Sequence, residues 1–159
     1  MSVAFTKEDS AETAAETQLP DRPISEHANL VTQEGLAALQ RQLVEAKLAY
    51  EAASLVDDIN ERRRQSAGPV RDLRYFTERL RTAQLVPTPD GETIAFGSTV
   101  TFSRNDGRVQ TYRLVGEDEA DPAAGSISYV SPIARLLIGK QVGDVVSLGN
   151  DELEVLSVS

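Results

Sequence analysis

Three carboxylates lie close together near the middle of the chain, at Asp57, Asp58 and Glu61, and three arginines follow at 62–64. Carboxylate oxygens are the ligands that hard cations such as Mg²⁺ prefer, so this cluster has the chemistry to help hold a metal ion that activates water. The alternative is a solvated, charged helix end, whose acids pair with the neighbouring arginines for little free energy.

The residue types that other catalytic mechanisms need are scarce. The 159 residues include no cysteine and one histidine, His27, which we expect to be a solvated side chain. These counts exclude thiolate nucleophiles, disulfides and a Ser-His-Asp triad. The net charge of −9 argues against binding to duplex DNA through its phosphates and favours a protein partner. No apolar run approaches 18 residues and no signal peptide is recognisable, so we expect a soluble, cytoplasmic monomer without membrane contact.

Two helical patterns flank the acidic cluster. Apolar residues recur at alternating spacings of 3 and 4 over residues 36–53 and again over 73–83. This spacing is typical of an antiparallel two-helix coiled coil. When the two patterns are folded against each other, the turn falls between Ile59 and Asn60, so the acids lie at the tip. We therefore predict a helical hairpin over residues 31–86.

Two local features define the arms of this hairpin. Thr32 has the side chain of an N-cap for the first arm. Gly68-Pro69 interrupts the second arm, and a proline inside a helix costs about 3 kcal/mol. The sequence therefore leaves open whether residues 60–68 are helical or irregular.

The remaining segments have different compositions. Residues 1–30 are rich in Glu, Ala, Thr and Ser without apolar periodicity, which predicts a disordered tail. Residues 87–93 contain two prolines and Asp90-Gly91, which predicts a linker. Residues 94–159 then alternate with period two, as β-strands do.

Turn and cap residues divide this last segment. Asn105-Asp106-Gly107 predicts a hairpin turn, and Ser131-Pro132 predicts the start of a helix over 132–138. We predict an α+β fold, in which an antiparallel coiled-coil hairpin precedes a five-stranded, mostly antiparallel sheet with one helix packed on it.

One long stretch resembles a known family. Residues 116–140, preceded by Phe96-Gly97-Ser98-Thr99-Val100 and followed by Val142-Gly143-Asp144-Val145-Val146, resemble the C-terminal domain of the GreA/GreB transcript-cleavage factors. The resemblance is dense over 94–158 and looser over 31–86. It implies an FKBP-like domain at 94–159 that docks on bacterial RNA polymerase core, and an accessory factor rather than an enzyme.

The resemblance also implies site residues. Asp58 and Glu61 match the family's Asp-x-x-Glu tip motif. In the family this motif helps hold a second Mg²⁺ in the polymerase active site, where backtracked RNA is cut. The nascent RNA and the DNA template are therefore implied as indirect partners. The chain departs from the family after Glu61, where it reads Arg-Arg-Arg-Gln, and its coiled coil is shorter. Those arginines have the chemistry to contact RNA or to form a solvated face. The implied docking surface comprises Ser131, Pro132, Ile133, Ala134, Glu119 and Asp121.

Three other functions stay open. The first is a regulator that occupies the polymerase's secondary channel without cleavage. It would resemble the short-hairpin nucleoside diphosphate kinase regulators. An FKBP-like sheet suggests a peptidyl-prolyl isomerase, although such a site needs an aromatic-lined pocket. The third alternative is an interaction module with no role at a polymerase.

Overall fold

The computed structural model describes residues 18–159 and divides into two compact units. Among the described residues, one unit contains 18–24 and Leu39–Arg81, and the other contains Ser25–Ala38 and Thr82–Ser159. We call them the hairpin unit and the sheet unit. Residues 1–17, most of the predicted tail, lie outside the described residues. Within 18–159, no helix is both long and apolar enough to cross a membrane.

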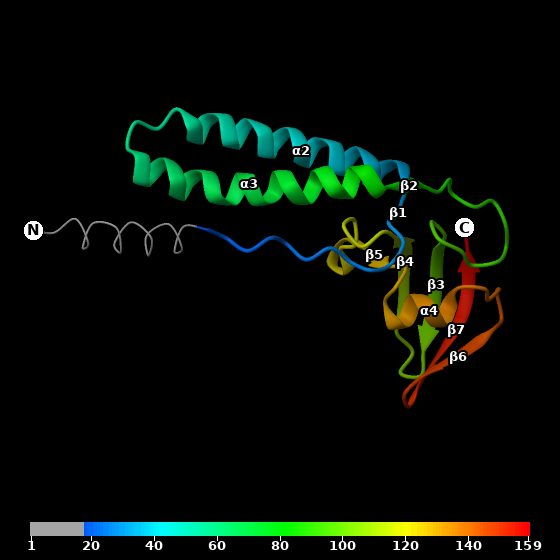
Figure 1. Cartoon of the computed structure of the whole chain (residues 1–159). Coiled ribbons are helices and arrows are strands. Elements are labelled where there is room, and N and C mark those ends of the chain that lie inside the picture. The colour runs from blue at the N-terminus through cyan, green and yellow to red at the C-terminus, as the bar shows by residue number, and fades with distance from the viewer. Residues whose placement is uncertain (1–17) are drawn as a thin grey trace, which may run out of the picture. The chain divides into compact units, whose positions relative to one another are not determined.

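Two helices form the hairpin, as predicted (Figure 1). Helix α2 spans Gln33–Ser54 and α3 spans Ile59–Thr82. The buried side chains of α2 include Leu39, Ala46 and Ala53, which repeat every seven residues along one face. This face packs on α3, whose buried apolar residue is Phe76. Because two of these three are alanines, partly buried side chains such as Leu43 and Leu80 add to the apolar surface of the two helices.

The structure corrects one detail of the predicted hairpin and decides another that the sequence left open. The connection comprises residues 55–58 instead of centring between Ile59 and Asn60, because Asp58 begins a new helix before the apolar pattern reaches its midpoint. Helix α3 continues through Pro69. Proline removes one backbone donor, and the flanking residues 66–70 are only half-buried, so water can solvate the carbonyl that this donor would have met.

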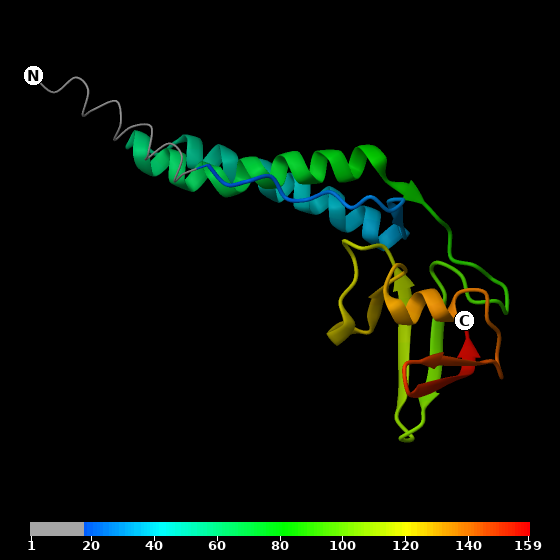
Figure 2. The ribbon, with the colours of Figure 1, turned by 60° about the horizontal axis from the view of Figure 1, so that its bottom comes forward.

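The sheet unit contains a five-stranded mixed sheet and a short helix (Figure 2). Its strand order is β5-β4-β3-β7-β6, and every pairing is antiparallel except that of β4 with β5. The α+β prediction is therefore confirmed. The elements are β3 (Thr99–Arg104), β4 (Val109–Val115), η1 (Pro122–Ala124), β5 (Ser126–Ser128), α4 (Pro132–Leu137), β6 (Val145–Leu148) and β7 (Asp151–Val158).

The core of this unit lies between the sheet and α4. Phe102 and Leu114 from the strands and Ala134 and Leu137 from α4 are all inaccessible to solvent. Helix α4 begins as predicted, because the Ser131 hydroxyl accepts a hydrogen bond from the Ala134 amide at 3.3 Å. The packing fixes α4 on one face of the sheet and leaves its other side exposed.

Residues 18–30 differ from the expected disordered tail. In the hairpin unit, residues 18–24 make contacts with α3 that are described below. In the sheet unit, β1 (Leu30–Val31) pairs in parallel with β2 (Gln84–Leu85), and the Tyr129 hydroxyl donates to the Ala28 carbonyl. These residues lack periodicity because they form extended chain with isolated contacts instead of a regular element.

Gly116 is the position where the N-terminal segment approaches most closely. A Cβ atom on Gly116 would lie 2.3 Å from the Leu30 carbonyl oxygen, which no real contact allows. We expect Gly116→Ala to destabilise the protein by about 1–3 kcal/mol, as overpacked sites do, in a urea titration followed by circular dichroism. Gly68→Ala is the control, since a Cβ there meets nothing within 4 Å and alanine favours a helix. Equal stability of the two variants would contradict the close approach.

Candidate functional site

The predicted tip acids lie at the connection of the hairpin. Asp57 and Asp58 are exposed in that connection, and Glu61 is in the first turn of α3. The Asp58 carboxylate, through Oδ1, accepts a hydrogen bond from the Glu61 amide at 2.8 Å. Asp58 is therefore the N-cap of α3, and its charge lies beside the positive end of the helix dipole.

Arg62 closes the connection from the other side. Its Nε donates to the Val56 carbonyl at 2.7 Å, and its Nη2 donates to the Asp57 carbonyl at 3.2 Å. These bonds satisfy two backbone carbonyls of the connection itself, which lies outside both helices and so has no helical partners for them. The sequence grouped Arg62 with the other two arginines as a charge run, but its side chain is committed to the connection. No pattern in the sequence distinguishes it from its neighbours.

The Glu61 carboxylate is engaged by residues one turn later on α3. Its Oε2 lies 3.2 Å from Arg64 Nη1, and its Oε1 accepts from Gln65 Nε2 at 3.0 Å. Both partners are exposed, so each contact contributes little free energy and is easily exchanged for another ligand. The carboxylate is thus held in place without being sequestered.

The tip offers part of a metal-ligand set. Asp58 uses one oxygen as the cap, and the other is free of the hydrogen bonds seen within residues 18–159. Over the same residues, no three His, Cys, Asp or Glu side chains are grouped to hold an ion. Asp58 and Glu61 therefore fit a hard divalent cation only as two ligands whose partners come from another molecule.

Two exposed apolar side chains flank these acids, and the sequence analysis did not single them out. Leu55 is 81% exposed and Ile59 is 57% exposed. Ile59 follows the cap Asp58 directly, and Leu55 is the first residue of the connection. The end of the hairpin therefore presents both carboxylates and hydrophobic surface.

The predicted docking residues divide into exposed and buried ones. Pro132 is exposed, Ser131 and Ile133 are half-buried, and Ala134 is fully buried in the core. Ala134 therefore cannot contact a partner. Helix α4 packs on the sheet, and its period of about 3.6 residues per turn points Ala134 and Leu137 into the core. A shallow groove beside α4 is lined by Val130, Pro132, Arg135, Leu136, Ser147, Leu148 and Gly149.

The acidic turn at residues 117–121 contributes to the fold as well as to the surface. Glu119, predicted for docking, accepts a hydrogen bond at 2.7 Å from Thr32, which also caps α2 through the Gly35 amide. A Cβ on Gly35 would lie 2.7 Å from Glu119 Oε2, so an alanine there would push the end of the Glu119 side chain aside. Asp121 is exposed and remains available to a partner.

One ionisable group at the start of α2 has a shifted pKa. A backbone hydrogen bond at Glu34, and then the charge of Arg113 whose Nη1 lies 3.3 Å away, lower the pKa of the Glu34 carboxyl from its ordinary value. A carboxyl whose pKa is lowered by folding stabilises the folded state at pH values above its pKa in the unfolded chain. This stabilisation is lost as the pH falls through the pKa of the same group in the folded protein. Because the Glu34 side chain is largely exposed, we expect it to contribute little.

The sequence comparisons agree on one family. Residues 88–159 match the family model described as "Transcription elongation factor, GreA/GreB, C-term". The chain is 34% identical over 151 residues to transcription elongation factor GreA of Desulfovibrio desulfuricans, covering 86% of this chain and 93% of that protein. It is 44% identical over 95 residues to transcription elongation factor GreB of Neisseria meningitidis serogroup B, covering 55% of this chain and 58% of that protein.

Solved structures of related factors also match. The GreA factor homolog 1 (Gfh1) of Thermus thermophilus is 23% identical with a TM-score of 0.39, covering 82% of this chain and 97% of that one. The transcription elongation factor GreA/GreB of Nitrosomonas europaea is 14% identical with a TM-score of 0.40, covering 82% and 96%.

Proposed function

The chain belongs to the GreA/GreB family of transcription elongation factors, and from this we propose that it binds bacterial RNA polymerase core and regulates elongation with its hairpin in the secondary channel. In this proposal the sheet unit provides the docking surface and the hairpin reaches inward. The factor is accessory and changes the rate of a reaction that the polymerase itself performs.

One observation carries the proposal: the end of a narrow helical hairpin presents Asp58 and Glu61 to solvent. The 24 residues of α3 extend about 36 Å at 1.5 Å per residue, so an object two helices wide carries these carboxylates far from its base. A pore wide enough for two helices would admit it. The acids are fixed to a helix N-terminus, which orients them better than a flexible loop would.

The two carboxylates are suited to assist a metal ion of the polymerase. A Mg²⁺ shared between the two proteins would activate water for cleavage of backtracked RNA. Asp58 offers its free oxygen, and Glu61 offers a carboxylate whose side-chain partners are weakly held. The arrangement supports stimulation of cleavage, with the remaining ligands supplied by the polymerase.

A second version of the function is favoured by a different observation. Asp58 already caps α3, and the resemblance implies a hairpin shorter than the family's, so the second version is a factor that occupies the channel without cutting RNA. A stalled, backtracked elongation complex separates the versions. Accelerated cleavage with the wild-type protein supports the first, and binding without acceleration supports the second.

The docking surface yields a prediction that is independent of the tip. Pro132 is exposed on the free side of α4 and borders the groove. We expect Pro132→Arg to weaken binding to polymerase core by about 10-fold, because a charge placed in an apolar contact must lose water. Binding is measured by co-migration in native gels or by fluorescence anisotropy.

Val109→Arg provides the control for that experiment. Val109 is also exposed and apolar, but it lies in β4 beside the β3–β4 turn, outside the groove. Equal binding of both variants would place the contact elsewhere. Failure of the wild-type protein to co-migrate with core polymerase would overturn the proposed function.

A prolyl isomerase receives no support from the sheet unit. Phe102 and Phe96, two of the four aromatic residues in 87–159, are buried, and the groove beside α4 has no aromatic lining residue. An aromatic-lined pocket is what such a site needs.

A further inference from the structure

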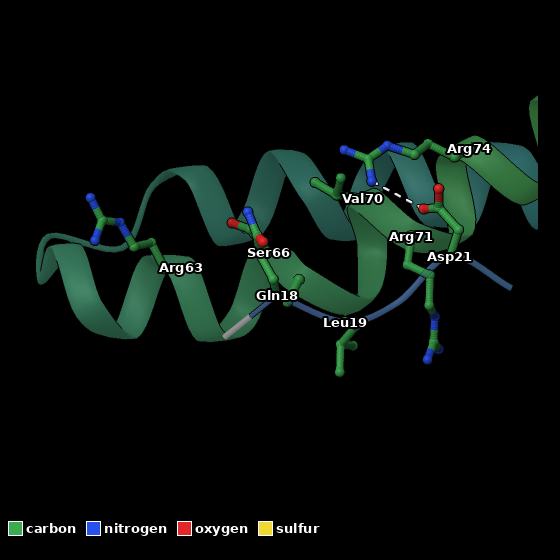
Figure 3. A pocket seen from close by; sticks show the side chains of 9 residues that line it. Gln18, Leu19, Asp21, Arg63, Ser66, Val70, Arg71 and Arg74 are labelled. Carbon is green, nitrogen blue, oxygen red and sulfur yellow. Dashed lines mark hydrogen bonds and ion pairs between the residues drawn. The ribbon is translucent and has the colours of Figure 1, made fainter. Parts of the chain in front are cut away.

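Helix α3 is strongly basic in an otherwise acidic chain. It carries seven arginines and three acidic residues, whereas the whole chain has a net charge of −9. Three of these arginines, Arg63, Arg71 and Arg74, line a cleft of about 610 Å³ beside α3 in the hairpin unit (Figure 3). A guanidinium group binds phosphate oxygens through two parallel N–H donors, so these arginines favour ligands that carry phosphate.

The other wall of this cleft is a segment of the same chain. Residues 18–24, which we call the strap, follow α3 in an extended form that Pro20 and Pro23 favour. The helix face beneath the strap contains Ser66 and Ala67, whose small side chains let the strap approach closely.

Arg22 is the anchor of the strap. Its guanidinium lies 3.9 Å from the centroid of the Tyr75 ring and 5.1 Å from that of Phe76. Its Nη1 also lies 3.3 Å from Asp72 Oδ1, and both side chains are about two-thirds covered. A cation between an aromatic face and a partly covered carboxylate is held more strongly than an exposed ion pair.

Asp21 provides the contact that faces the arginines. Its Oδ1 lies 3.1 Å from Arg74 Nη1, and the two side chains are 68% and 64% exposed (Figure 3). Arg71 Nε, on the same cleft, is buried without a hydrogen-bond partner, although Asp72 Oδ1 lies 3.4 Å away. The strap thus places one weakly held carboxylate where arginine donors remain to be satisfied.

We propose that the strap is an intramolecular competitor, whose Asp21 occupies the arginine face of α3 and must be displaced when a phosphate polymer binds there. Arg22 keeps the strap at high local concentration beside α3. Because the Asp21–Arg74 pair is exposed, little free energy is needed to displace Asp21 from Arg74. The strap therefore lowers the affinity of α3 for polyanions without abolishing it.

The test uses the full chain and inorganic polyphosphate of fixed length, with binding followed by fluorescence anisotropy at low salt. We expect Arg22→Ala to bind about 3- to 10-fold more tightly than the wild type, because the strap loses its anchor. The direction of the change in affinity is decisive. Arg22→Ala removes a positive charge, so an effect of charge alone would weaken the binding of polyphosphate. Adding Arg74→Ala to Arg22→Ala should remove the gain.

Asp21→Asn and Asp106→Asn form a matched pair for the same assay. Both remove an exposed carboxylate that pairs with an arginine, and both raise the net charge by one. We expect tighter binding for Asp21→Asn only. Unchanged or weaker binding by Arg22→Ala with wild-type helix content, or equal effects of the matched pair, would overturn the proposal. Because no polymerase is present, this outcome is separate from the fate of the proposed function.

Discussion

Asp58→Asn is expected to lower stimulated cleavage of backtracked RNA by about 100-fold while the hairpin stays folded. Asparagine caps a helix as well as aspartate does. Its side-chain oxygen can accept the hydrogen bond that the Glu61 backbone N–H donates to Asp58 at 2.8 Å. A neutral amide is a much poorer ligand for Mg²⁺ than a carboxylate. The measurements are the cleavage rate in a stalled complex at saturating factor and the thermal unfolding of the variant.

Two further variants separate the cap from the metal ligand. Asp58→Ala loses both roles, so its cleavage defect should be accompanied by a loss of about 1 kcal/mol of stability. Glu51→Gln is the control, because this exposed acid lies on α2 before the connection. If Asp58→Asn cleaves at the wild-type rate, the acid acts only as a cap and the metal role is wrong.

Phe102→Ala is expected to destabilise the sheet unit by about 3–5 kcal/mol. Phe102 is fully buried in the core, with its ring centroid 6.1 Å from that of Tyr112. Truncation removes its contacts and leaves a cavity that the paired strands β4 and β7 cannot close. A loss of this size is a large fraction of the stability of an ordinary domain, and urea unfolding followed by circular dichroism measures it.

Val109→Ala serves as the reference for that measurement. Val109 lies in the neighbouring strand β4 but is 61% exposed, so we expect a change within about 0.5 kcal/mol. A loss below about 1 kcal/mol for Phe102→Ala would show that this side chain is not central to the core.

The tip illustrates how one short motif serves two purposes. Asp-x-x-Glu at residues 58–61 places an acid at the N-cap and another in the first helical turn, which is the pattern that starts a helix. The same spacing brings both carboxylates to the end of the hairpin. The structural and the metal-binding interpretations are therefore compatible, and only a substitution that preserves the cap can separate them.

Local interactions let the sequence predict much of the fold. The period-two pattern and Asn105-Asp106-Gly107 indicated the β3–β4 hairpin, and Gly107 has the positive φ of 84° that such a turn requires. Ser131-Pro132 likewise indicated the start of α4, because a cap bond joins residues three apart. The acids at the tip followed from the heptad spacing, although the turn lies a few residues earlier.

Contacts between residues far apart in the chain were decided only by the tertiary structure. Thr32 meets Glu119 across 87 residues, and Arg22 meets Asp72 across 50, so neither pairing is marked by a local pattern. These contacts determine that Glu119 is engaged within the protein and that the strap lies on α3. Sequence spacing determined which elements form, because helices, turns and caps are short-range. Packing determined which of their charged side chains remain free to act.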